Sequence, residues 1–169
     1  MDTTFAVETD TTLRLSRRFE ATPERVFAAW TRPEALRLWW CPAGWRPEGI
    51  LVDLRPGGTY RFSMIRQRGA PPVTVEGRFL EIEHGRKLVY SWRWVGAFPN
   101  MPETKVTVDF HEIADGTEVS LRQEPLALPL CTTHLAGWLA ACDRLARVVG
   151  ISAPGSGPVG ATRLGLVSS

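Results

Sequence analysis

The chain has little net charge and few cysteines. Its 20 basic and 18 acidic residues leave a net charge of only +2 over 169 residues, so charge gives no reason to expect nucleic acid or an acidic membrane as a partner. Cys41, Cys131 and Cys142 are an odd number without CxxC spacing, and they predict neither a disulfide framework nor a zinc site. A reducing compartment is the simpler interpretation. The N-terminal residues MDTTFAVETDTTL lack a basic region followed by an apolar core, so we expect no secretory signal and a cytoplasmic protein.

Sequence motifs of catalysis and cofactor binding are also missing. The chain contains no G-x-S-x-G, no H-E-x-x-H, no phosphate-binding glycine loop and no dinucleotide fingerprint. The histidines, His84, His111 and His134, are scattered, whereas a metal site needs convergent ligands. His134 falls in the first turn of the long helix predicted below, from where it could reach the mouth of a cavity beneath that helix. The start of a helix disfavours the protonated form of a histidine, so we expect a neutral His134. We therefore expect no cofactor, no metal ligands and no catalytic residue.

Tryptophan, by contrast, is abundant, with 7 in the chain, and aromatic side chains either fill a core or line a pocket. The longest periodic stretch runs from about Thr132 to Val149 and predicts an amphipathic helix. Its apolar stripe is Leu135, Trp138, Leu139, Cys142, Leu145, Ala146 and Val149. Arg144 and Arg147 are expected on its solvated side, and such charges exclude a membrane span.

The preceding residues predict a sheet. A strand is expected over residues 12–20, followed by two short helices that begin at Thr22-Pro23 and Thr31-Arg32-Pro33. Six further strands with period-two alternation and tight turns lie between Gly49 and the long helix. Because tight turns join antiparallel neighbours, the prediction is an α+β fold in which one helix covers an antiparallel sheet.

The two ends of the chain are expected to lie outside this domain. Residues 1–11 are predicted to be a flexible N-terminal tail, because they are polar. Residues 151–169 are rich in Gly, Pro and Ser and are predicted to be a flexible C-terminal tail. The domain then spans residues 12–150.

Strand parity assigns a large aromatic set to the sheet face that meets the helix. It comprises Tyr60, Phe62, Met64, Phe79, Tyr90, Trp92, Trp94, Val106, Val108 and Phe110. A curled sheet closed by one helix is difficult to fill, and leftover volume would favour an apolar or aromatic small molecule. An aromatic stripe is usually structural, however, and from parity alone a packed core is the favoured interpretation.

Five segments, taken in order, match the pattern of a known family. They are FEATPERVFAAWTRPEALRLWWCP, DLRPGGTYRF, EGRFLEIEHGRKLVYSW, TKVTVDFHEIADGTEVSLRQE and GWLAACDRLARVV, and together they span about residues 12–149. The chain resembles the homologues of the heat-shock chaperone ATPase activator, which belong to the START-like (SRPBCC) superfamily. The resemblance implies a helix-grip fold, with a curved seven-stranded antiparallel sheet around a long C-terminal helix and a hydrophobic cavity between them.

The resemblance and the inward parity together give a predicted ligand-binding cavity. Its residues are Trp39, Trp40, Tyr60, Phe62, Met64, Phe79, Trp92, Trp94, Val108, Leu135, Trp138 and Leu139. Cys41 stands where the family usually has Gly, and we interpret it as an inert apolar residue rather than a reactive thiol.

Three functions follow as hypotheses. The first is binding of a hydrophobic or aromatic small molecule without catalysis. The second is an enzyme on the same scaffold, of the aromatase/cyclase type or a hydrolase, which needs polar groups such as those of His134, Tyr60 and Tyr90 in the cavity. The third is modulation of a chaperone ATPase, which the family name suggests but which the chain disfavours because it lacks the additional N-terminal domain of a full activator. A homodimer is compatible with the resemblance, although no sequence feature sets the oligomeric state.

Overall fold

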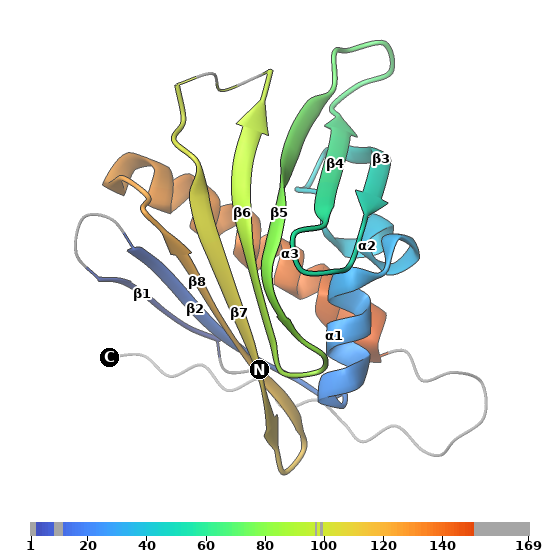
Figure 1. The fold of residues 1–169 in the computed structure, drawn as a ribbon, viewed down its shortest axis with the longest axis vertical. Helices are drawn as coiled ribbons and strands as arrows, with labels where there is room; N and C mark the ends of the chain where they lie inside the picture. The colour runs from blue at the N-terminus through green and yellow to red at the C-terminus, as the bar shows by residue number, and fades with distance from the viewer. Residues whose placement is uncertain (1–2, 9–11, 97, 99, 151–169) are drawn as a thin grey trace.

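The computed structural model describes residues 3–8, 12–96, 98 and 100–150, and in it one antiparallel sheet curves around a long helix (Figure 1). The elements, in chain order, are β1 (Thr3–Glu8), β2 (Thr12–Phe19), α1 (Pro23–Thr31), α2 (Pro33–Trp39), β3 (Arg46–Val52), β4 (Thr59–Ile65), β5 (Val73–Glu83), β6 (Lys87–Val95), β7 (Thr104–Ile113), β8 (Gly116–Glu124) and α3 (Leu128–Gly150). The predicted helix-grip architecture, with two short helices after a strand and a long helix at the end, is confirmed.

The sheet has eight strands, so the predicted number of seven is wrong. Its order is β1-β2-β8-β7-β6-β5-β4-β3. The additional strand is β1, which pairs antiparallel with β2 from Thr3 opposite Arg17 to Glu8 opposite Thr12. Polarity alone predicts a tail for residues 3–8, whereas the run Thr-Phe-Ala-Val contains strand-forming residues and meets an open sheet edge. The predicted C-terminal tail, residues 151–169, lies outside the described residues.

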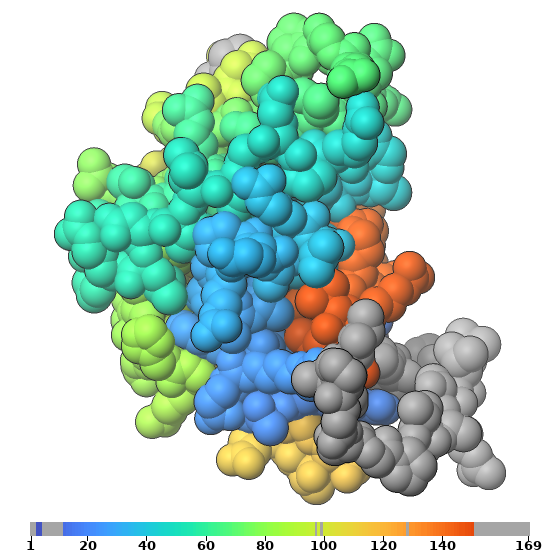
Figure 2. Space-filling view, turned by 90° about the vertical axis from the view of Figure 1, so that its right-hand side faces the viewer, coloured from blue at the N-terminus to red at the C-terminus, as the bar shows by residue number. Residues whose placement is uncertain are grey.

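The two short helices form where capping residues and prolines predicted them. The side chain of Thr22 accepts a hydrogen bond from the Arg25 backbone N–H at 3.4 Å, and Pro23 occupies the first turn of α1. The indole N–H of Trp39 in α2 donates to the carbonyl of Ala29 in α1 at 2.8 Å. Because Trp39 is fully buried, this bond fixes the angle between the helices. Figure 2 shows them on the surface between the strands and α3.

Helix α3 begins at Leu128, four residues before the predicted start near Thr132. Pro129 lies in the first turn of α3, where its missing N–H costs no hydrogen bond. The side chains that α3 buries most deeply are Cys131, His134, Trp138, Ala141, Cys142, Leu145 and Val149. Leu135 and Leu139 are only half-buried, so the buried stripe is rotated from the predicted one.

Arg144 was predicted to lie on the solvated side of α3, and this is wrong. Its side chain instead binds the end of α2. Its Nε donates to the carbonyl of Trp39 at 2.9 Å, and its Nη2 donates to the carbonyl of Cys41. The last carbonyls of a helix lack intrahelical partners, and a cation there also suits the helix dipole. Cys41 itself is buried, and burial raises the pKa of its thiol to about 11 against the opposing effect of Arg144, which agrees with the predicted inert residue.

Replacement of Arg144 by alanine is expected to destabilise the protein by about 2 kcal/mol, because two carbonyl groups lose a charged donor. The measurement is the free energy of unfolding from urea denaturation. The matched control is Arg147→Ala on the exposed side of the same helix, for which we expect a change within about 0.5 kcal/mol. Equal losses for both variants would show that Arg144 does not hold α2.

Candidate ligand-binding site

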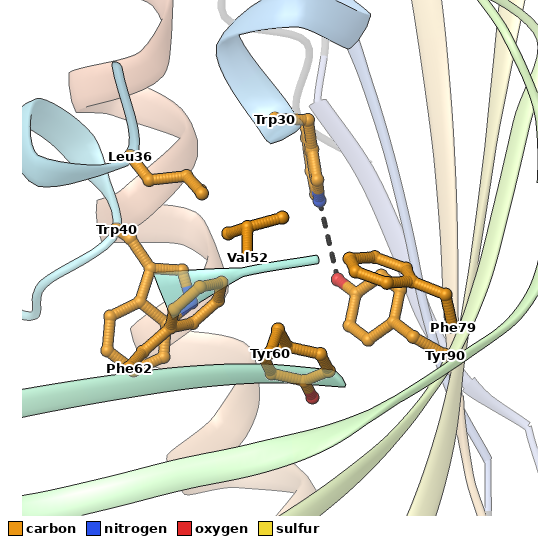
Figure 3. A pocket seen from close by; sticks show the side chains of 8 residues that line it. All are labelled: Trp30, Leu36, Trp40, Val52, Tyr60, Phe62, Phe79 and Tyr90. Carbon is orange, nitrogen blue, oxygen red and sulfur yellow. Dashed lines mark hydrogen bonds between the residues drawn. The ribbon is translucent and has the colours of Figure 1, made fainter. Parts of the chain in front are cut away.

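The space between the sheet and the helices has a closed part and an open part. In the closed part, which we call the aromatic core, aromatic side chains point toward one another and leave about 10 Å³ (Figure 3). It is lined by Trp30, Leu36, Trp40, Val52, Tyr60, Phe62, Phe79 and Tyr90. This volume is at the limit for one water molecule, so the aromatic core holds no organic ligand.

Hydrogen bonds fix the tyrosines of the aromatic core. The Trp30 indole N–H donates to the Tyr90 hydroxyl at 3.3 Å, and the Tyr60 hydroxyl donates to the carbonyl of Ser91 at 2.6 Å. The close approach of Tyr60 and of β6 to β5 requires glycine at position 77, because a Cβ there would lie 2.8 Å from Cε1 of Tyr60 and 1.9 Å from the Ser91 oxygen. Burial raises the pKa of both tyrosines above the ordinary value, so they stay neutral and serve packing.

The open part is a cavity of about 530 Å³, which we call the tryptophan cavity. It lies at the end of the sheet near the β6–β7 loop, between the turn after α2 and the first half of α3. Its lining is Trp40, Pro42, Ala43, Trp45, Met64, Val73, Trp92, Trp94, Phe98, Met101, Leu130, Thr133, His134, Ala136, Gly137, Trp138, Ala140 and Ala141. Phe98 is 47% exposed at its rim, so the cavity opens to solvent.

Small residues on α3 create this volume. Ala136, Gly137, Ala140 and Ala141 face the cavity from one side, while indole rings from β6 and the α2–β3 turn line it elsewhere. A Cβ built on Gly137 would meet no atom within 4 Å. The helix therefore stands away from the sheet's side chains here, whereas further along α3 the side chains of Leu145 and Val149 fill the space.

His134 is held as a neutral ring in the cavity wall. Its Nδ1 lies 2.9 Å from the carbonyl of Leu130 and its Nε2 accepts from the Trp94 indole N–H at 3.2 Å. These partners require the proton on Nδ1. Burial lowers the pKa of His134 below its usual value, more strongly than the Leu130 bond raises it. Both ring nitrogens are occupied, so the position suits a structural link better than an acid or base.

The tryptophan cavity is uncharged. None of the residues that line it is Asp, Glu, Lys or Arg, and its polar side chains are Thr133, the neutral His134 and the indole N–H groups. Among the described residues, no group of three or more His, Cys, Asp and Glu side chains could hold a metal ion. Such a site can bind apolar surface but cannot neutralise a charged group.

The residues predicted for the cavity separate into three sets. Trp40, Met64, Trp92, Trp94 and Trp138 line the tryptophan cavity. Tyr60, Phe62 and Phe79 belong to the aromatic core, which Trp40 also borders. Trp39, Val108, Leu135 and Leu139 line neither space, because the first two are fully buried elsewhere and the last two lie on the flank of α3.

Several lining residues lie outside the set predicted from the sequence. Trp45, Phe98 and Met101 come from irregular segments, where strand parity gives no direction. The lining alanines and Gly137 on α3 lie outside the predicted apolar stripe. Their spacing, four residues apart in Ala136–Ala140 and Gly137–Ala141, is a signal for a helix face that leaves room opposite it.

Comparisons with known proteins were consistent with this architecture. A family model described as "Activator of Hsp90 ATPase homolog 1-like protein" matches residues 20–150. A crystal structure of a Chromobacterium violaceum protein is similar, with 28% identity, a TM-score of 0.76, and coverage of 84% of this chain and 99% of that one. An AHSA1-like protein from Aeromonas hydrophila has 23% identity, a TM-score of 0.68, and coverage of 82% and 92%. A Rhodobacter sphaeroides protein has 24% identity, a TM-score of 0.75, and coverage of 87% and 97%.

No curated protein matched the chain. In the part of the chain that the structure describes, no helix is both long enough and apolar enough to cross a bilayer.

The lowered pKa of His134 predicts an acid-dependent loss of stability. The unfolded chain takes up the proton near pH 6.5 and the folded chain only at lower pH, so the free energy of unfolding falls as pH decreases through this interval. The slope is at most about 1.4 kcal/mol per pH unit. We expect His134→Gln, which lacks a titrating group, to remove this part of the slope in urea denaturations between pH 7 and pH 5. An unchanged slope in the variant would contradict the account of His134.

Proposed function

The chain belongs to the activator of Hsp90 ATPase homolog 1-like family, and we propose that it binds an uncharged, hydrophobic small molecule in the tryptophan cavity without catalysis. The observation that carries this proposal is a cavity of about 530 Å³ with an aromatic and aliphatic lining, beside an aromatic core that is packed to about 10 Å³. Ligand pockets in proteins usually measure about 300–1,000 Å³ and are mostly apolar, with few polar groups.

The contrast between the two spaces supports a binding role. Aromatic side chains from the same strands could close the interior completely, as they do around Tyr60 and Tyr90. In the tryptophan cavity, large side chains on the sheet instead face the alanines and Gly137 of α3 across unfilled space. Exposed apolar surface in contact with water is unfavourable by roughly 25 cal/mol per Å², and an apolar ligand that covers it recovers this free energy.

The polar groups that the enzyme hypothesis invoked support binding rather than chemistry. The hydroxyls of Tyr60 and Tyr90 belong to the aromatic core and are kept neutral by burial, which raises the pKa of each. Both ring nitrogens of His134 are engaged with Leu130 and Trp94. A general acid or base needs a proton within hydrogen-bond reach of the substrate, and these three residues use their polar atoms for internal bonds.

The test is a variant that fills the tryptophan cavity from the helix. In Gly137→Leu, the new side chain projects into open space, and leucine has a higher helix propensity than glycine. We therefore expect the variant to fold. We expect affinity for a neutral, environment-sensitive dye such as Nile red to fall at least tenfold, as measured by fluorescence titration.

The matched control is Thr132→Leu, which adds the same apolar side chain to an exposed position of α3 outside the cavity lining. It should bind the dye as the parent chain does. If Gly137→Leu folds, as shown by circular dichroism, and still binds with parental affinity, the tryptophan cavity is not the binding site.

A further inference from the structure

The indole N–H of Trp92 lacks the hydrogen bond that four other indole N–H groups of the interior make. Trp30, Trp39, Trp94 and Trp138 donate to Tyr90, Ala29, His134 and Gln123, respectively. The Trp92 N–H is buried and has no acceptor among the residues that the structure describes. Buried donors without a partner are rare in folded proteins, because each costs free energy relative to a solvated donor.

Trp92 also occupies a central position in the aromatic wall. Its ring centroid lies 5.9 Å from that of Trp40, 5.8 Å from that of Trp94 and 5.5 Å from that of Trp138. All four rings line the tryptophan cavity, and the Trp92 side chain is only 5% exposed. The unpaired donor therefore belongs to a side chain that borders the proposed binding site.

We propose that Trp92 Nε1 donates a hydrogen bond to an uncharged oxygen acceptor, such as a ketone or ester carbonyl, on a ligand whose remaining surface is apolar. This inference rests on the proposed function and names the chemistry of its ligand. A carboxylate is disfavoured because the cavity lining contains no cation, and an ammonium group is disfavoured because it contains no acidic side chain. His134 is engaged at both ring nitrogens, and Trp94 and Trp138 donate within the protein, whereas the buried N–H of Trp92 has no acceptor among the described residues.

The experiment is a cycle in which the donor and the acceptor are removed separately. The probes are 2-acetylnaphthalene and 2-isopropenylnaphthalene, which differ by a carbonyl oxygen in place of a methylene group. Their dissociation constants are measured by equilibrium dialysis for the parent chain, for Trp92→Phe and for the control Trp45→Phe. The control replaces the indole ring of Trp45, another residue of the same cavity, by a phenyl ring.

We expect the affinity ratio of ketone to hydrocarbon to fall about three- to tenfold in Trp92→Phe, as for the loss of one hydrogen bond, and to be unchanged in Trp45→Phe. The ratio cancels both the hydration of the ketone and the lost ring area. Equal ratios in all three proteins would overturn the inference.

Two further readouts keep the result decisive. If Trp92→Phe does not fold, the assigned Trp92 indole N–H resonance of the parent chain is followed by NMR, and it should shift downfield with the ketone but not with the hydrocarbon. The same shift with both probes would overturn the inference. Tighter binding of 2-naphthoate or of (2-naphthylmethyl)trimethylammonium than of the ketone would overturn it as well. Binding of the hydrocarbon that Gly137→Leu abolishes would leave the proposed function intact, so the two proposals fail separately.

Discussion

The packing of one helix against a sheet of eight strands is the constraint on which the rest of the structure depends. A curved sheet of this width offers more inner surface than α3 can cover, and α1 and α2 fill only one side. Bulky rings close the interior beside α1 and α2, where Trp30 reaches Tyr90. Toward the first half of α3, alanines and Gly137 leave the tryptophan cavity unfilled. The packed core and the cavity are thus two outcomes of the same mismatch. Side chains of α1, α2 and the neighbouring strands fill the first, and small side chains on α3 leave the second open.

Polar contacts then hold the helices in this arrangement. Arg144 links α3 to the end of α2 through the carbonyls of Trp39 and Cys41, and the Trp39 indole links α2 to α1. At the other end of α3, His134 links the helix to Trp94 on β6. The turn after α2, the strand β6 and the helix α3 all line the cavity, so these bonds hold three of its walls in place.

The sequence predicted the fold well because its signals are local. Thr22-Pro23 and Pro33 mark helix starts, and period-two alternation fixes which side of β4 and β6 faces the helix. Parity could not separate Tyr60 in the packed core from Trp92 beside the cavity, because both point inward. That difference depends on which helix lies opposite each ring, α1 and α2 at Tyr60 and α3 at Trp92, and on irregular segments that contribute Trp45 and Phe98. The eighth strand was missed because its pairing with β2 is a tertiary contact.

Native mass spectrometry of the protein purified from its own host tests the central claim most directly, by comparison with the denatured mass. The account predicts a small additional mass that disappears on denaturation and is absent from Gly137→Leu. The account would be contradicted by a protein that carries no additional mass even after incubation with a hydrophobic metabolite extract. An adduct that Gly137→Leu retains would also contradict it.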